Sequence, residues 1–126
     1  MALIVVIENS PLMRPALRDL LQLEGHTVIT TGRVDEAFGL LEDIIGVDLV
    51  IADYAMPDMD GAMLVQRLRD NAKYRATPIL MLTLNGDQRV GRQALNAGAN
   101  DCLVPPITVE GLKNAVKQML TGHRTG

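Results

Sequence analysis

The stretch VDLVIADYAMPDMDG, residues 47–61, decides the fold. Its first part, DLVIA at residues 48–52, is a short apolar run that is typical of a buried strand in a parallel sheet. Asp53 follows this run directly, and the turn-rich segment YAMPDMDG separates the run from a pattern of helical spacing at residues 62–69. A strand, a loop that contains an acid and a helix, in this order, indicate one unit of an α/β protein.

Short apolar runs alternate with helical patterns along the whole chain. The expected strands cover residues 3–7, 27–30, 48–52, 79–82 and 101–104. The helices that follow them are expected from Ser10, around residues 34–41, at 62–69, at 87–97 and after Thr108. Continuous apolar strands that alternate with helices predict a parallel sheet covered on both faces. With right-handed crossovers, the predicted fold class is α/β, with a doubly wound, five-stranded parallel sheet and five helices.

The first of these helices has an ambiguous start. Ser10 is expected as its N-cap and Pro11 as its first helical residue. Pro15 then either lies within the first turn or removes a backbone hydrogen bond. The apolar face of this helix is expected to consist of Leu12, Ala16, Leu20 and Leu23.

Length and composition place limits on the kind of protein. The chain has 126 residues, of which 48% are hydrophobic and 2% aromatic, so one domain with an aliphatic core is expected. We expect this domain to cover residues 1–121 and a flexible tail to cover 122–126. The net charge of −3 argues against direct contact with nucleic acid. With one cysteine, no internal disulfide can form, and without a signal or membrane-spanning segment we expect a cytoplasmic protein with no membrane contact.

The predicted sheet brings polar residues together at one edge. Glu8 and Asn9 follow the first strand, Asp53 follows the third, and Thr83 and Asn85 follow the fourth. Ligands of open α/β sheets bind at the carboxyl ends of the strands. Oxygen ligands suit Mg²⁺, a carboxylate can attack phosphorus, and a hydroxyl can donate to a phosphoryl oxygen. The alternative is that each of these residues is an ordinary polar loop residue.

Four segments of the sequence resemble one known family. VVIEN, VDLVIADYAMPDMDG, PILMLT and DCLVPPI stand in the order and at the separations found in receiver domains of bacterial two-component response regulators, the chemotaxis receiver among them. The resemblance spans nearly the whole chain. It implies a flavodoxin-like fold with strand order 2-1-3-4-5, and a signalling protein that is not an enzyme.

The resemblance also implies a role for each site residue. Asp53 would accept a phosphoryl group from a histidine kinase or a phosphotransfer protein, and Thr83 would bind that group and act as a switch. Glu8, Asn9, Asp53 and the backbone carbonyl of Ala55 would hold Mg²⁺. The face formed by the fourth helix, fifth strand and fifth helix would bind an output partner, an attached effector domain or a second copy of the chain.

Three positions depart from the family pattern. Asn9 replaces an acid, so weak Mg²⁺ binding is expected. Pro105 stands in place of a lysine, and Cys102 replaces an aromatic residue, where simple core filling is the plainer interpretation. Pro105 and Asn9 support an alternative function, a pseudo-receiver that binds partners without phosphorylation. A phosphate-ester hydrolase with an aspartate nucleophile is disfavoured, because Ala55 occupies the place of its second acid and no cap domain fits in the chain.

Overall fold

Five parallel strands form the centre of the protein in the computed structural model, which describes residues 1–83, 86 and 88–122. Their order is β2-β1-β3-β4-β5, and every neighbouring pair is parallel. The strand bounds are β1 Leu3–Ile7, β2 Thr27–Thr31, β3 Leu49–Asp53, β4 Ile79–Leu82 and β5 Asp101–Leu103. The predicted sheet and its order are therefore confirmed.

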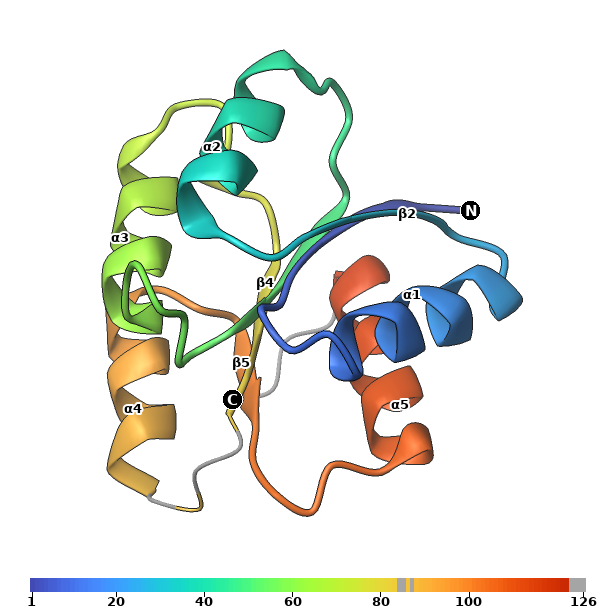
Figure 1. Ribbon diagram of the computed structural model, residues 1–126. Coiled ribbons are helices and arrows are strands. Elements are labelled where there is room, and N and C mark those ends of the chain that lie inside the picture. The colour runs from blue at the N-terminus through green and yellow to red at the C-terminus, as the bar shows by residue number, and fades with distance from the viewer. Residues whose placement is uncertain (84–85, 87, 123–126) are drawn as a thin grey trace.

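Helices cover both faces of this sheet (Figure 1). Their bounds are α1 Met13–Leu23, α2 Val34–Asp43, α3 Gly61–Asp70, α4 Gln88–Ala97 and α5 Val109–Leu120. α1 and α5 lie on one face, and α2, α3 and α4 lie on the other (Figure 1). None of these described helices is both long enough and apolar enough to cross a membrane.

Alternate residues of each central strand face opposite layers, and this alternation builds two aliphatic cores. In β1, Val5 and Ile7 pack under α2, α3 and α4, whereas Ile4 and Val6 pack under α1 and α5. The side chains of β1, from Ile4 on, of β3 and of β4 are buried on both faces, so the strands read as unbroken apolar runs. The sequence pattern therefore arises from the double cover of the sheet.

The start of α1 differs from the prediction. The helix begins at Met13, and Pro11 precedes it. The Ser10 hydroxyl still accepts hydrogen bonds from the amides of Leu12 and Met13, at 3.3 and 3.1 Å. Pro15 lies in the first turn, where a proline is tolerated.

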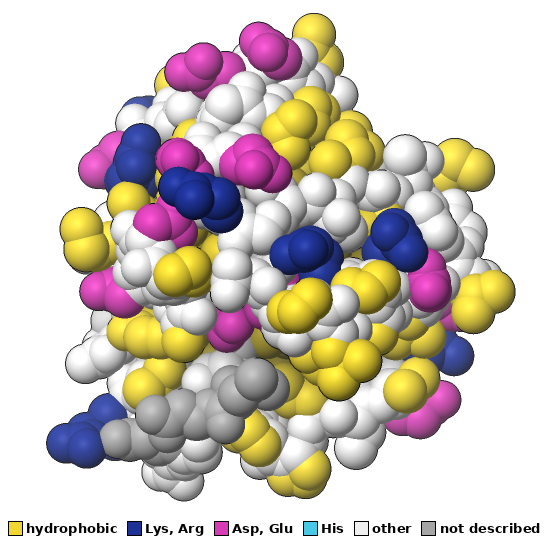
Figure 2. Space-filling view, viewed as in Figure 1, with side chains coloured by type: hydrophobic (Ala, Val, Ile, Leu, Met, Phe, Trp, Pro, Cys, Tyr) yellow, Lys and Arg dark blue, Asp and Glu magenta, His cyan; other side chains and the backbone are white. Residues whose placement is uncertain are grey.

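Of the predicted apolar face of α1, Leu20 packs partly buried against the core, but the rest of the prediction is wrong. Leu17 and Leu21 are buried against the sheet, while Leu12 and Leu23 are 80% and 84% exposed. α1 is apolar over a wide arc, and the sheet covers only part of it. Exposed apolar side chains consequently lie over α1 in Figure 2.

Other boundaries shift by a residue. Asp53 is the last residue of β3 and does not follow it, and β2 extends to Thr31 while β5 ends at Leu103. Asn85 and the expected helix start at Asp87 lie outside the described residues, as do residues 123–126 of the expected tail. Asp53 in the strand matters for function, because its backbone is then held by the sheet.

Candidate functional site

The buried polar side chains of the described residues gather at the carboxyl edge of the sheet. They are Glu8, Thr31, Asp53 and Thr83, and each is at most 8% exposed. Glu8, Asp53 and Thr83 come directly after or at the ends of β1, β3 and β4, which are neighbours in the sheet. The structure therefore places three of the predicted site residues together in a setting that withholds them from water.

Glu8 and Asp53 form a buried pair of acids. Burial raises the pKa of Glu8 to about 7, the amide of Ser10 at 3.2 Å from its Oε2 lowers it, and the neighbouring Asp53 raises it again. Two carboxyl groups this close to each other favour a proton or a cation between them. The pair is thus a place where positive charge binds.

Backbone amides of the two residues that follow Asp53 help to fix its position. The amide of Tyr54 donates to the carbonyl of Leu82 at 2.8 Å, which continues the pairing of β3 with β4. The amide of Ala55 donates to Asp53 Oδ1 at 3.2 Å. These two contacts fix the carboxylate in position.

A cleft of about 600 Å³ opens beside Asp53. Its described lining consists of Asp53, Tyr54, Ala55, Met56, Asp60, Thr83 and Val90. The amide of Thr83 donates to the carbonyl of Leu103 at 3.0 Å, so this residue is fixed to the end of β5. The carboxylate of Asp53, Ala55 and Thr83 therefore line one open space.

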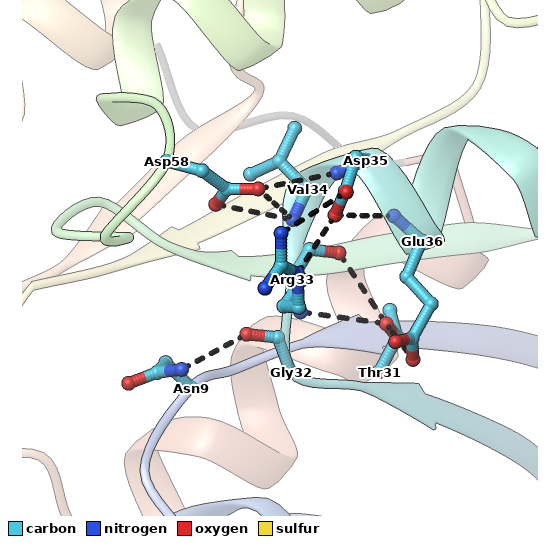
Figure 3. Close-up of polar contacts among 8 residues, drawn as sticks. All are labelled: Asn9, Thr31, Gly32, Arg33, Val34, Asp35, Glu36 and Asp58. Carbon is cyan, nitrogen blue, oxygen red and sulfur yellow. Dashed lines mark hydrogen bonds and ion pairs between the residues drawn. The ribbon is translucent and has the colours of Figure 1, made fainter.

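Asn9 is not among the residues that line this cleft. Its side chain is exposed, and its Nδ2 donates to the carbonyl of Gly32 at 3.1 Å (Figure 3). Arg14 also holds this loop, because its Nη1 donates to the carbonyls of Glu8 and Asn9 at 3.0 and 3.4 Å. An acid at position 9 could not donate to Gly32, so the asparagine gives this loop a contact that the family's usual residue lacks.

Asp58 caps α2 from a distant part of the chain. Its Oδ2 accepts from the amides of Val34 and Asp35 at 3.1 and 3.3 Å (Figure 3). Arg33, at the N-cap position, accepts no helix amide with its side chain, and its guanidinium instead donates to the carboxylate of Asp35. The loop that follows Asp53 thus supplies the cap, and it ties α2 to the site.

The other two departures from the family pattern, at Cys102 and Pro105, lie in β5 and in the loop that follows it. Pro105 is exposed in the loop between β5 and α5. Cys102 packs half-buried beside Gly91 of α4, and burial raises the pKa of its thiol to about 11. A neutral, packed thiol agrees with the interpretation of Cys102 as core filling.

Sequence reasoning missed three residues around the site. Asp60 caps α3 by accepting from the amide of Met63 at 2.9 Å, and its place just before Gly61 was the signal that could have found it. Tyr54 donates to Gln93 of α4 at 2.8 Å. The partners of Tyr54 and Asp58 are 39 and 24 residues away, so no local pattern reveals them.

Few side chains at the site could bind a metal ion. Among the described residues, no three acidic, histidine or cysteine side chains lie close enough together to hold a metal ion. Glu8 and Asp53 supply two carboxylates, and the remaining ligands that were predicted are an amide and a backbone carbonyl.

Comparisons with known proteins agree with this geometry. The family model described as response regulator receiver domain matches residues 4–117. A chemotaxis protein CheY homologue of Campylobacter jejuni is 34% identical over 125 residues, which are 98% of this chain and 96% of the relative. The chemotaxis response regulator CheY4 of Vibrio cholerae has a similar structure, with a TM-score of 0.87 at 30% identity over 95% of this chain and 99% of that one.

A third similarity concerns the fold alone. The receiver domain of a sensor histidine kinase from Pseudomonas aeruginosa has a TM-score of 0.85 at 24% identity, over 95% of this chain and 98% of that one. Its structure was determined with a magnesium ion coordinated in the active-site cleft.

Proposed function

Because the chain belongs to the family of response regulator receiver domains, we propose that it is a signalling switch in which Asp53 accepts a phosphoryl group. The donor is a histidine kinase or a phosphotransfer protein, and the switch works in the cytoplasm. Receiver domains are signalling modules that transmit this modification to an output. The observation that carries the proposal is the position of Asp53, buried at the end of β3, beside Glu8 and open to a cleft shared with Thr83.

We propose Mg²⁺ as the cofactor. The donor set fits this ion, because Mg²⁺ is usually bound by one or two carboxylates together with phosphate oxygens and waters. Glu8 and Asp53 would supply the carboxylates, with Asn9 and the carbonyl of Ala55 as further ligands. When bound, the ion neutralises the charge that gathers between the carboxylates and the phosphoryl oxygens. Binding is expected to be weak, because Asn9 brings no charge.

The residues of this chain divide the remaining work. An oxygen of Asp53 forms the bond to phosphorus, and the amide of Ala55 at 3.2 Å orients that carboxylate. The hydroxyl of Thr83 donates to a phosphoryl oxygen. Because the amide of Thr83 is bonded to Leu103 at the end of β5, a shift of Thr83 would move β5.

The output surface proposed for this switch is the face of α4, β5 and α5. Leu95, Val104 and Val109 are 44%, 42% and 58% exposed on these elements and on the residue that follows β5. Exposed apolar side chains of this kind suit a partner, an attached effector domain or a second copy of the chain.

A pseudo-receiver is the second candidate function. It is favoured by the exposed Pro105 and by the described lining of the cleft, which includes no lysine or arginine. In this case the same fold binds a partner without being phosphorylated.

Phosphorylation of the purified chain distinguishes the two functions. With Mg²⁺ and a small phosphodonor or a donor protein, intact mass spectrometry should detect one phosphoryl group that hydroxylamine removes. Asp53→Asn should abolish it, whereas Asp43→Asn, at an exposed position, should not. Pro105→Lys should raise the rate by up to ~10²-fold, because one preorganised electrostatic contact commonly contributes that much.

The controls also define failure. Gln22→Lys adds the same charge at an exposed position on α1, outside the proposed output surface, and should leave the rate unchanged. If the chain accepts no phosphoryl group from any donor while partner binding persists in Asp53→Asn, the pseudo-receiver replaces the switch.

A further inference from the structure

The cleft beside Asp53 is larger than its proposed phosphoryl group requires. Its volume of about 600 Å³ lies within the range of pockets that hold small organic groups. Tyr54, Ala55, Met56 and Val90 give it apolar walls, while Asp53, Asp60 and Thr83 are its polar groups. A phosphoryl group would use only the end at Asp53 and Thr83, so room remains for a further side chain.

The charge of this space is one-sided. The described lining has two acids, Asp53 and Asp60, and no lysine or arginine, and the buried Glu8 lies behind Asp53. Arg14, the cation at the β1 end of the site, is directed to the carbonyls of Glu8 and Asn9. Among the described residues of the cleft, no cation is therefore available to neutralise the oxygens of an entering phosphoryl group, and position 105 holds an exposed proline.

The shape and charge of the cleft together indicate which kind of side chain could occupy it. A lysine or arginine side chain has an apolar stem that packs against apolar walls and a cationic head that reaches an acid. The walls and acids of the cleft match these two parts. A cation supplied by a second protein stabilises phosphoryl transfer in other systems, where it contributes 10³–10⁵ in rate.

We propose that the missing cation is supplied in trans, by a lysine or arginine of the phosphodonor protein that enters the cleft during transfer. This inference rests on the proposed function and adds a requirement for the donor, a cationic side chain close to its phosphohistidine. In the step, an oxygen of Asp53 bonds to phosphorus as the bond from phosphorus to the donor nitrogen breaks. The donor nitrogen keeps the electron pair of the broken bond and takes a proton from water. The entering cation donates neither an electron pair nor a proton.

Chemical rescue tests this inference without the donor protein. The chain is incubated with Mg²⁺ and phosphoramidate, and the initial rate of Asp53 phosphorylation is measured with butylguanidinium, with the neutral butylurea or with added sodium chloride. Butylguanidinium should raise the rate several-fold and saturably, because it carries the charge and stem of an arginine. Butylurea and sodium chloride should not raise it.

Three variants make the result decisive. Pro105→Lys has its own cation, so butylguanidinium should no longer accelerate it. Asp60→Asn keeps an oxygen for the amide of Met63 and should weaken the binding of butylguanidinium, followed in the metal-free chain by NMR shifts of the Met56 and Val90 methyl groups. Arg89→Gln should leave the unrescued rate unchanged, and a fall would assign the cation to this chain and overturn the proposal.

The failures of the two proposals differ. If Pro105→Lys is phosphorylated faster than the wild type but butylguanidinium rescues nothing, the inference fails and the proposed function stands. Equal acceleration by butylurea or sodium chloride also overturns the inference. If neither form accepts a phosphoryl group under any condition, both are wrong.

Discussion

The two sides of Asp53 differ in how the chain holds them. On the α2 side, Asn9 bonds to Gly32, and Asp58 caps α2, so that the loops after β1, β2 and β3 are joined (Figure 3). On the α4 side, among the described residues, Tyr54 reaches Gln93 across the loop, and a cleft opens between Asp53 and α4.

This difference gives the departures from the family pattern opposite consequences. Asn9 loses a charge but gains a hydrogen bond that holds the loop at α2. Pro105 likewise brings no charge, and its side chain is exposed. The cation that we propose to be supplied in trans would act on this second side.

The largest effect that tests this comparison comes from Glu8, in the buried centre between the two sides. Its folded pKa of about 7 is above its ordinary value of 4.5, so the folded state holds the proton more tightly than the unfolded state does. Stability should fall as pH rises from about 4.5 to about 7, by up to roughly 3 kcal/mol, and then level off.

Denaturant unfolding of the metal-free chain across this pH range measures the slope of the unfolding free energy against pH. Glu8→Gln should flatten it, whereas Glu110→Gln, at an exposed position of α5, should leave it unchanged. A slope that persists in Glu8→Gln would assign it to another group.

Removal of the cap on α2 should have the next largest effect. Asp58→Ala leaves the amides of Val34 and Asp35 without their acceptor and should cost about 1 kcal/mol of unfolding free energy. Asp58→Asn keeps an oxygen acceptor and should cost less. Amide exchange should rise in α2 and not in α4, and a uniform rise would contradict the separation of the two sides.

Asn9→Asp should act in two opposite directions. It removes the donor to Gly32 and should cost about 0.5–1.5 kcal/mol of stability in the metal-free chain. It also adds a negative charge and should tighten Mg²⁺ binding. Asn9→Ala separates the effects, because it loses the contact without gaining the charge. Calorimetric titration that finds equal Mg²⁺ affinity in wild type and Asn9→Asp would argue against position 9 as a ligand.

The smallest effect is expected on the α4 side. Tyr54→Phe removes an exposed hydrogen bond to Gln93 and should cost about 0.5 kcal/mol, at the low end for such a bond. The change in amide exchange should be confined to α4. A cost larger than that of Asp58→Ala would show that the α4 side is the more firmly held one and would reverse the comparison.

The sequence by itself determined the sheet, its helices and the core of the site. Apolar runs and helical spacing depend on neighbouring residues, so they predicted ten elements to within a few residues. Because the carboxyl ends of parallel strands meet at one edge, the residues at three strand ends, Glu8, Asp53 and Thr83, could be brought together without coordinates.

Only the tertiary structure decided which surfaces and partners these elements use. α1 offers leucines over a wide arc, and its contact with the sheet selected Leu17 and Leu21 over Leu12 and Leu23. The contacts of Asn9 with Gly32 and of Asp58 with α2 join residues 23 and 24 positions apart, so they exist only once the sheet has aligned its loops. The cleft likewise needs β3, β4 and α4 in place, because a space is defined by all of its walls at once.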